Sequence, residues 1–137
     1  MWKDVLGLTA RLVNEDFQVL VSNIKEKNTD IFRLNWNGDY NDPNAFLEVF
    51  ESGNPSNFVG FEDAEFDDLM QAAGAQANPE RRMIYLEEAE RRMLRNHPVI
   101  PIYFYVNRSM VSPEVGGWGD NVLNYHYSRH LRLAGHE

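Results

Sequence analysis

The chain has 137 residues, about the length of one domain, and its hydrophobic content of 43% is ordinary for a globular protein. Its formal net charge of −8, from 21 acidic and 13 basic residues, argues against partners with phosphate-rich surfaces, both nucleic acid and anionic membranes. The absence of cysteine excludes disulfides, thiol nucleophiles and thiolate metal sites.

The N-terminal residues lack the basic and apolar regions of a signal peptide. No apolar run approaches the roughly 18 residues that a membrane span needs. We therefore expect no direct membrane insertion by this chain.

The first elements of the chain predict a β-α-β unit. Residues 7–14 alternate between apolar and polar side chains, which is typical of a strand. Residues 14–16 provide capping side chains for a helix from Phe17 to about Lys27, and residues 30–36 predict a second strand. The usual right-handed crossover would place these two strands parallel in one sheet.

The middle of the chain is predicted to be helical. Residues 45–50 indicate a short helix, and residues 52–60, rich in Gly, Asn, Pro and Ser, indicate a loop. Asn78 and Pro79 suit the N-cap and first position of a longer helix. Two apolar stripes at helical spacing mark two successive helices: Phe66, Leu69, Met70 and Ala73, then Met83, Leu86, Ala89 and Met93. The second helix also has a charged face, which we expect to be solvated: Arg81, Arg82, Glu87, Glu88, Arg91 and Arg92.

After a helix end at residues 96–98, residues 99–110 predict a strand, in which Pro101 indicates an edge or a bulge. Residues 112–124 are irregular, and residues 125–133 form a last short element. The expected fold class is α/β, a mixed sheet with flanking helices in a single domain over residues 1–137.

The second predicted strand leads directly into residues 37–43, an aromatic, glycine and carboxylate cluster that Pro43 closes. In α/β sheets, ligand contacts gather just beyond the carboxyl ends of strands. A candidate site is therefore expected here. Taken alone, the same pattern also fits a simple turn with Asx hydrogen bonds.

Several motifs occur together in order along the chain: Gly38-Asp39-Tyr40-Asn41-Asp42-Pro43, Ser52-Gly53-Asn54, Phe66-Asp67-Asp68-Leu69, Tyr85-Leu86-Glu87-Glu88-Ala89-Glu90, Pro98-Val99-Ile100-Pro101-Ile102-Tyr103-Phe104-Tyr105 and Val111-Ser112-Pro113-Glu114-Val115-Gly116-Gly117. In this order and spacing they resemble the C-terminal region of the oligopeptide- and dipeptide-binding proteins that serve ABC importers, family 5 of the solute-binding proteins. The resemblance covers nearly the whole chain.

The resemblance implies an extracytoplasmic receptor that closes two lobes over a short peptide and presents it to an importer permease. Family members are several times longer and carry a signal peptide or lipid anchor, so we expect this chain to be a C-terminal fragment. Residues 1 to about 105 would supply most of one lobe, and residues 106–137 would return toward the other. Neither a cofactor nor covalent chemistry is implied, and self-association is expected where the missing lobe leaves apolar surface exposed.

By resemblance, Asp39 is the partner of the ligand's α-amino group, because an ammonium taken out of water needs a carboxylate. Extended peptide is recognised by strand-like pairing, with pockets for alternate side chains. Tyr103 and Tyr105 share one face of the predicted strand, either toward ligand or toward core. The predicted ligand-binding residues are Asp39, Trp36, Asn37, Gly38, Tyr40, Tyr103 and Tyr105.

Two other classes of function remain open. Asp39 and Asp42 could act as the acid–base pair of a carboxylate-dependent hydrolase, although nothing in the sequence fixes their separation. The chain could also be a small acidic interaction module. His126 and His130 have the spacing of two metal ligands on a helix, but no third ligand is evident, and we assign no metal site.

Overall fold

A computed structural model describes residues 1–133 of the chain. They form two compact units, residues 1–34 and the residues from Asn35 onward, and each is described by itself. No helix within residues 1–133 is long and apolar enough to cross a membrane.

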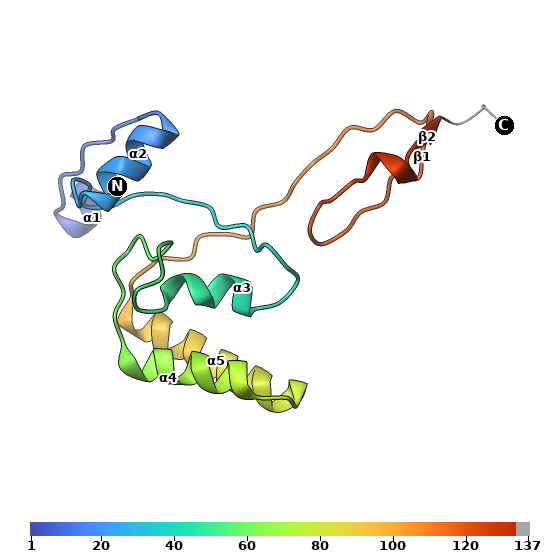
Figure 1. Cartoon of the computed structure of the whole chain (residues 1–137). Helices are drawn as coiled ribbons and strands as arrows, with labels where there is room; N and C mark the ends of the chain where they lie inside the picture. Colours follow the sequence, from blue (N-terminus) through green and yellow to red (C-terminus); the bar gives the residue numbers. More distant parts are fainter. Residues whose placement is uncertain (134–137) are drawn as a thin grey trace. The chain divides into compact units, whose positions relative to one another are not determined.

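The first unit contains two helices, α1 (Trp2–Leu6) and α2 (Phe17–Lys25), drawn in blue in Figure 1. Asp16 caps α2, because its side chain accepts a hydrogen bond from the backbone amide of Gln18 at 2.9 Å. Ile24 is the buried residue on its apolar face. The predicted capping segment and helix are confirmed.

The second unit is built around a helical hairpin. The short helix α3 (Asn44–Leu47) continues into the 3₁₀ turn η1 (Glu48–Phe50), and a loop leads to α4 (Ala64–Ala75) and α5 (Pro79–Asn96). Figure 1 shows α4 and α5 lying along each other, with α3 near them. All three predicted helices of this region are confirmed.

Side-chain caps set where the two long helices begin. The Asp63 carboxylate accepts from a first-turn backbone amide of α4 at 2.9 Å, and the Asn78 side chain accepts from the Arg81 amide at 3.0 Å at the start of α5. At the other end of α5, His97 adopts the left-handed conformation with φ of 54°, which terminates the helix. These boundaries follow from local sequence, so the helices could be predicted.

Apolar side chains from α3, α4 and α5 and the connecting loop form the core of the second unit. Phe61 and Phe66 meet edge to face with ring centroids 5.4 Å apart, a favourable aromatic geometry. Both predicted stripes face this core, although Leu69 is only partly buried and Met83 is exposed. The buried cluster consists of Leu47, Phe61, Phe66, Met70, Ala73, Leu86, Ala89 and Met93.

The three long strands predicted from the sequence are wrong for this structure. Residues 7–14, 30–36 and 99–110 have no strand pairing, so the expected parallel β-α-β unit is absent from the described residues. A strand is stable only when its backbone N–H and C=O groups pair with a neighbouring strand. Residues 1–133 do not supply that neighbour to any of the three segments.

A small sheet forms near the end of the described chain. Strand β1 (Val115–Gly116) pairs antiparallel with β2 (Arg132–Leu133), and the 3₁₀ turn η2 (Ser128–His130) precedes β2 (Figure 1). The predicted last short element at residues 125–133 is confirmed in η2 and β2. The described residues thus combine helices with a small sheet.

Candidate functional site

The loop that carries Asp39 is held by hydrogen bonds at both of its ends. Trp36 donates from its indole Nε1 to the carbonyl oxygen of Ala45 at 2.7 Å. At the other end, the Asn44 amide donates to Asp42 Oδ1 at 2.8 Å, an Asx-type turn that leads into α3. The segment from Trp36 to the start of α3 therefore forms one ordered loop.

A second set of side-chain contacts fixes Tyr40. Its hydroxyl donates to Glu48 Oε2 at 2.8 Å, and Asn44 Nδ2 donates both to the Tyr40 hydroxyl oxygen and to Glu48, each at 2.8 Å. Burial is the largest cause that raises the pKa of Tyr40, and the hydrogen bond and charge of Glu48 raise it further. Tyr40 is thus a neutral hydrogen-bond donor whose position depends on α3 and η1.

Gly38 allows the loop to approach α3 closely. A Cβ atom at this position would lie 3.1 Å from the ring of Phe46 and 3.3 Å from the Cβ of Ala45. Such a contact would force the neighbouring side chains to move. Glycine therefore suits this close approach, and its backbone leads directly into Asp39.

The two carboxylates of the loop have different environments. Asp39 is exposed, and its carboxylate makes no hydrogen bond or ion pair within residues 1–133. Asp42 is about one-third exposed and is fully engaged by another side chain. Of the two, only Asp39 is free to receive an external cation.

Asp42 binds Arg82 of α5 through a bidentate pair. Arg82 Nη1 donates to Oδ2 and Nη2 donates to Oδ1, both at 2.8 Å. The hydrogen bond from Arg82 is the main cause that lowers the pKa of Asp42, and the same pair raises the pKa of Arg82. Asp42 is therefore a charged structural group.

Sequence reasoning missed Arg82, which it placed on the solvated face of α5. Its partner lies 40 residues away in the chain, and nothing local distinguishes Arg82 from its charged neighbours. Arg92, on the same predicted face, likewise binds a distant carboxylate, Asp63, at 2.7 and 2.9 Å.

The remaining predicted ligand-binding residues lie in two separate parts of the chain. Asn37 is exposed in the loop beside Asp39. Tyr103 and Tyr105 lie in the extended segment 99–110, where each is 59% exposed. The structure thus gathers five of the predicted residues in one loop and leaves the two tyrosines on a separate, largely exposed segment.

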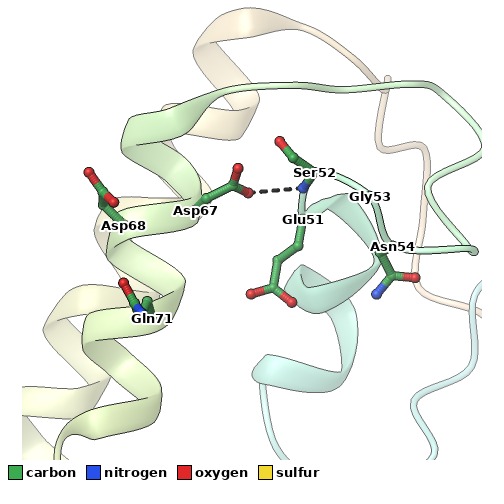
Figure 2. Close-up of a pocket in the computed structure, with 7 residues that line it drawn as sticks. All are labelled: Glu51, Ser52, Gly53, Asn54, Asp67, Asp68 and Gln71. Atoms are coloured by element: carbon green, nitrogen blue, oxygen red, sulfur yellow. Dashed lines mark hydrogen bonds between the residues drawn. The ribbon is translucent and has the colours of Figure 1, made fainter.

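A shallow hollow between α4 and the loop that follows η1 is a different feature, shown in Figure 2. Asp67 Oδ1 accepts from the Ser52 amide at 3.0 Å across it. Burial, followed by the charges of Asp67 and Glu48, raises the pKa of Glu51 on its wall. The hollow contains none of the predicted ligand residues, and its carboxylates do not form a metal-binding group within residues 1–133.

The two histidines with metal-ligand spacing are used otherwise. The ring of His126 stacks on Trp118 with centroids 3.6 Å apart, and His130 meets Tyr127 at an edge. His130 lies in the 3₁₀ turn at residues 128–130 and His126 lies outside it, so the two histidines are not on one face of an α-helix. The described part of the chain contains no group of three or more His, Cys, Asp or Glu residues that could hold a metal.

No family model matches the chain, but comparison with known proteins finds several peptide-binding proteins that are similar to it. The periplasmic oligopeptide-binding protein OppA of Escherichia coli is 28% identical over 137 residues, covering 99% of this chain and 25% of the relative. The oligopeptide-binding protein OppA of Bacillus subtilis is 35% identical over 108 residues, covering 78% of this chain and 20% of the relative.

Solved structures show the same relationship. The murein tripeptide-binding protein MppA of Escherichia coli has a TM-score of 0.85 at 27% identity, covering 98% of this chain and 27% of that chain. The OppA structure from Burkholderia pseudomallei has a TM-score of 0.84 at 29% identity, with 96% and 26% covered. The chain therefore spans about a quarter of the length of these relatives.

Proposed function

We propose that this chain, a homologue of the oligopeptide- and dipeptide-binding proteins over nearly its whole length, supplies part of a ligand-binding lobe for short peptides. The observation that carries the proposal is the contrast within one ordered loop, where Asp42 is neutralised by Arg82 and Asp39 is exposed and unpaired in the described chain. Asp39 would pair with the α-amino group of the peptide.

The chemistry of a peptide ligand fits these residues. An ammonium that leaves water requires a compensating negative charge, and Asp39 provides it. Trp36, Asn37, Gly38 and Tyr40 would surround the amino-terminal residue. Tyr103 and Tyr105 would contact the ligand from segment 99–110, where each side chain is 59% exposed and offers aromatic surface.

The relatives support a wider proposal. Residues 1 to about 105 would belong to one lobe and residues 106–137 would return toward a second lobe, with ligand binding closing the two about a hinge. The complete protein would act outside the cytoplasm, as a periplasmic or lipid-anchored receptor, and deliver peptide to an ABC importer permease. Binding of this kind involves no covalent chemistry and needs no cofactor, so the chain would not be an enzyme.

The hydrolase alternative is less well supported. An acid–base pair needs two carboxyl groups that face the reacting bond. Both oxygens of Asp42 are occupied by Arg82, and one also accepts from the Asn44 amide. The interaction-module alternative has no specific observation in its favour.

The test is an NMR titration of the chain with trialanine and with N-acetyl-trialanine, repeated for Asp39→Asn. Affinity should be weak, on the order of millimolar, because one lobe offers few contacts to offset the cost of association. We expect trialanine to shift the amide signals of residues 37–41, and acetylation to weaken binding. Since Asp39 is exposed, Asp39→Asn should cost roughly 1 kcal/mol or less, at most about fivefold in affinity.

Acetylation and Asp39→Asn should not add, because both remove the same ion pair. Asp68→Asn is the matched control, since Asp68 is an exposed carboxylate on α4, and it should bind as the wild type does. Additive losses would show that Asp39 does not hold the amino group. Micromolar binding would show that the chain does not need a second lobe.

A further inference from the structure

The pair between Asp42 and Arg82 joins the loop of the proposed site to the longest helix of the chain. Both N–H···O distances are 2.8 Å, and the two side chains are only 30% and 27% exposed. A bidentate arginine–carboxylate pair restricts orientation as well as distance. The loop is therefore held in a defined place relative to α5.

We propose that Arg82 is a positioning residue for ligand binding, which acts through Asp42 to fix the place of Asp39 and the net charge of the loop that carries it. The inference rests on the proposed function of Asp39. Arg82 itself contacts no ligand in this scheme. Through Arg82, the α4–α5 hairpin holds the binding loop in place.

The backbone between the two carboxylates is short and bonded to itself. The Asp42 amide donates to the Tyr40 carbonyl oxygen at 3.0 Å, so the chain turns tightly immediately after Asp39. The Tyr40 hydroxyl is bonded in turn to Glu48. A displacement of Asp42 would therefore be transmitted to Asp39 over very few rotatable bonds.

The pair also determines the charge of the loop. With Arg82 bound to Asp42, the loop presents one uncompensated carboxylate, which matches a single ammonium. Without Arg82, Asp42 would be a second free carboxylate close in sequence to Asp39, and the pair would attract cations of higher charge. Arg82 thus favours a monovalent amine over a divalent cation.

Another arginine of α5 provides a control. Arg91 pairs with Glu87 at 3.1 Å and with Glu88 at 3.3 Å, within its own helix and more than half exposed. Arg91→Gln removes the same charge from the same helix but leaves the loop untouched. Arg82→Gln removes the link to the loop.

The experiment uses the whole chain and measures trialanine affinity by NMR for the wild type and for Arg82→Gln, Arg91→Gln, Asp42→Asn and the double variant Asp42→Asn/Arg82→Gln. We expect Arg82→Gln to weaken trialanine binding about threefold and to shift the Trp36 indole signal, whereas Arg91→Gln changes neither. Because Arg82 acts through Asp42, adding Arg82→Gln to Asp42→Asn should cause no further loss. Arg82→Lys retains the charge without the planar guanidinium group and should restore only part of the affinity. If Arg82→Gln folds poorly, Arg82→Lys takes its place in the comparison.

Titration with Ca²⁺ distinguishes positioning from a general loss of structure. Arg82→Gln should bind Ca²⁺ more tightly at residues 37–43 than the wild type, an effect that partial unfolding does not produce. Equal trialanine affinity in the wild type and Arg82→Gln would overturn the inference while leaving the proposed function intact. If acetylation does not weaken trialanine binding to the wild type, both the inference and the proposed function are overturned, since there would be no bound amine to position.

Discussion

Asp42 and Asp63 each bind an arginine of α5 with both carboxylate oxygens and also accept a backbone amide. Arg82 approaches Asp42 at 2.8 Å on both oxygens, and Arg92 approaches Asp63 at 2.7 and 2.9 Å. The hydrogen bonds from these arginines are the largest causes that lower the pKa of each carboxyl group. At the residue scale, the charged state of both aspartates is therefore linked to folding.

This linkage predicts how stability depends on pH. A carboxyl group whose pKa is lowered by folding stabilises the native state above its unfolded pKa of about 4, and the contribution is lost as the pH falls through the folded value. We expect the contribution of these two pairs to the free energy of unfolding to be nearly constant from pH 7 to about pH 5 and to decrease below about pH 4. Urea unfolding followed by circular dichroism at each pH measures it.

Asp63→Asn should be less stable at neutral pH and should lose less stability on acidification than the wild type. Asp68→Asn, in which an exposed carboxylate of α4 is removed, should keep the wild-type acid loss. If the Asp63→Asn profile runs parallel to that of the wild type, the Arg92 pair contributes nothing to the pH dependence.

At the scale of elements, the α4–α5 hairpin holds the loop that carries Asp39 through the pair between Arg82 and Asp42. Phe66 of α4 and Leu86 of α5 are buried between the two helices, with 0% and 1% of their surface exposed. The same helix α5 that provides Leu86 to the core provides Arg82 to the loop. Packing of the hairpin and order in the loop are therefore coupled.

Leu86→Ala should destabilise the second unit by about 2–5 kcal/mol, because it removes buried methyl groups and leaves a cavity. Ile84→Ala, on the exposed side of α5 at 65% exposure, should change stability by about 0.5 kcal/mol or less. Urea unfolding at neutral pH compares the two variants. Equal losses would mean that the apolar stripe of α5 is not its buried face.

At the scale of the whole molecule, the exposed apolar residues of segment 99–110 are the most unusual feature. Phe104 is 98% exposed and its neighbours are similarly open to solvent. Solved relatives with TM-scores of 0.84–0.85 have nearly four times the length. Within residues 1–133 the segment has no strand pairing, and its apolar side chains are left open to solvent. The exposed large apolar residues of the segment are Ile100, Ile102, Tyr103, Phe104, Tyr105, Val106 and Met110.

Such a segment should promote self-association, since its contiguous exposed apolar side chains offer a surface to a second copy. We expect dimers or larger species at high concentration, measured by light scattering after gel filtration. Phe104→Lys should shift the distribution toward monomer. Gln71→Lys adds the same charge at an exposed position of α4 and should leave the distribution unchanged. A wild-type chain that stays monomeric at all concentrations would contradict this.

Several features of this protein followed from the sequence alone. The helices α2, α3, α4 and α5 could be predicted because caps such as Asp16 and Asn78 and the apolar spacing of each helix are local properties. The ordered motifs were enough to identify the peptide-binding relatives. The place of Asp39 in a loop before α3 was likewise predictable.

Other features were decided only by the tertiary structure. The strands at residues 7–14, 30–36 and 99–110 were wrong here because alternation predicts a strand only where another segment supplies its hydrogen bonds. Asp39 and Asp42 look equivalent in the sequence, and only the fold brings Arg82 across 40 residues to neutralise one of them. Long-range ion pairs leave no local pattern, because their geometry depends on how helices pack. The difference between a free carboxylate and a paired one therefore had to come from the structure.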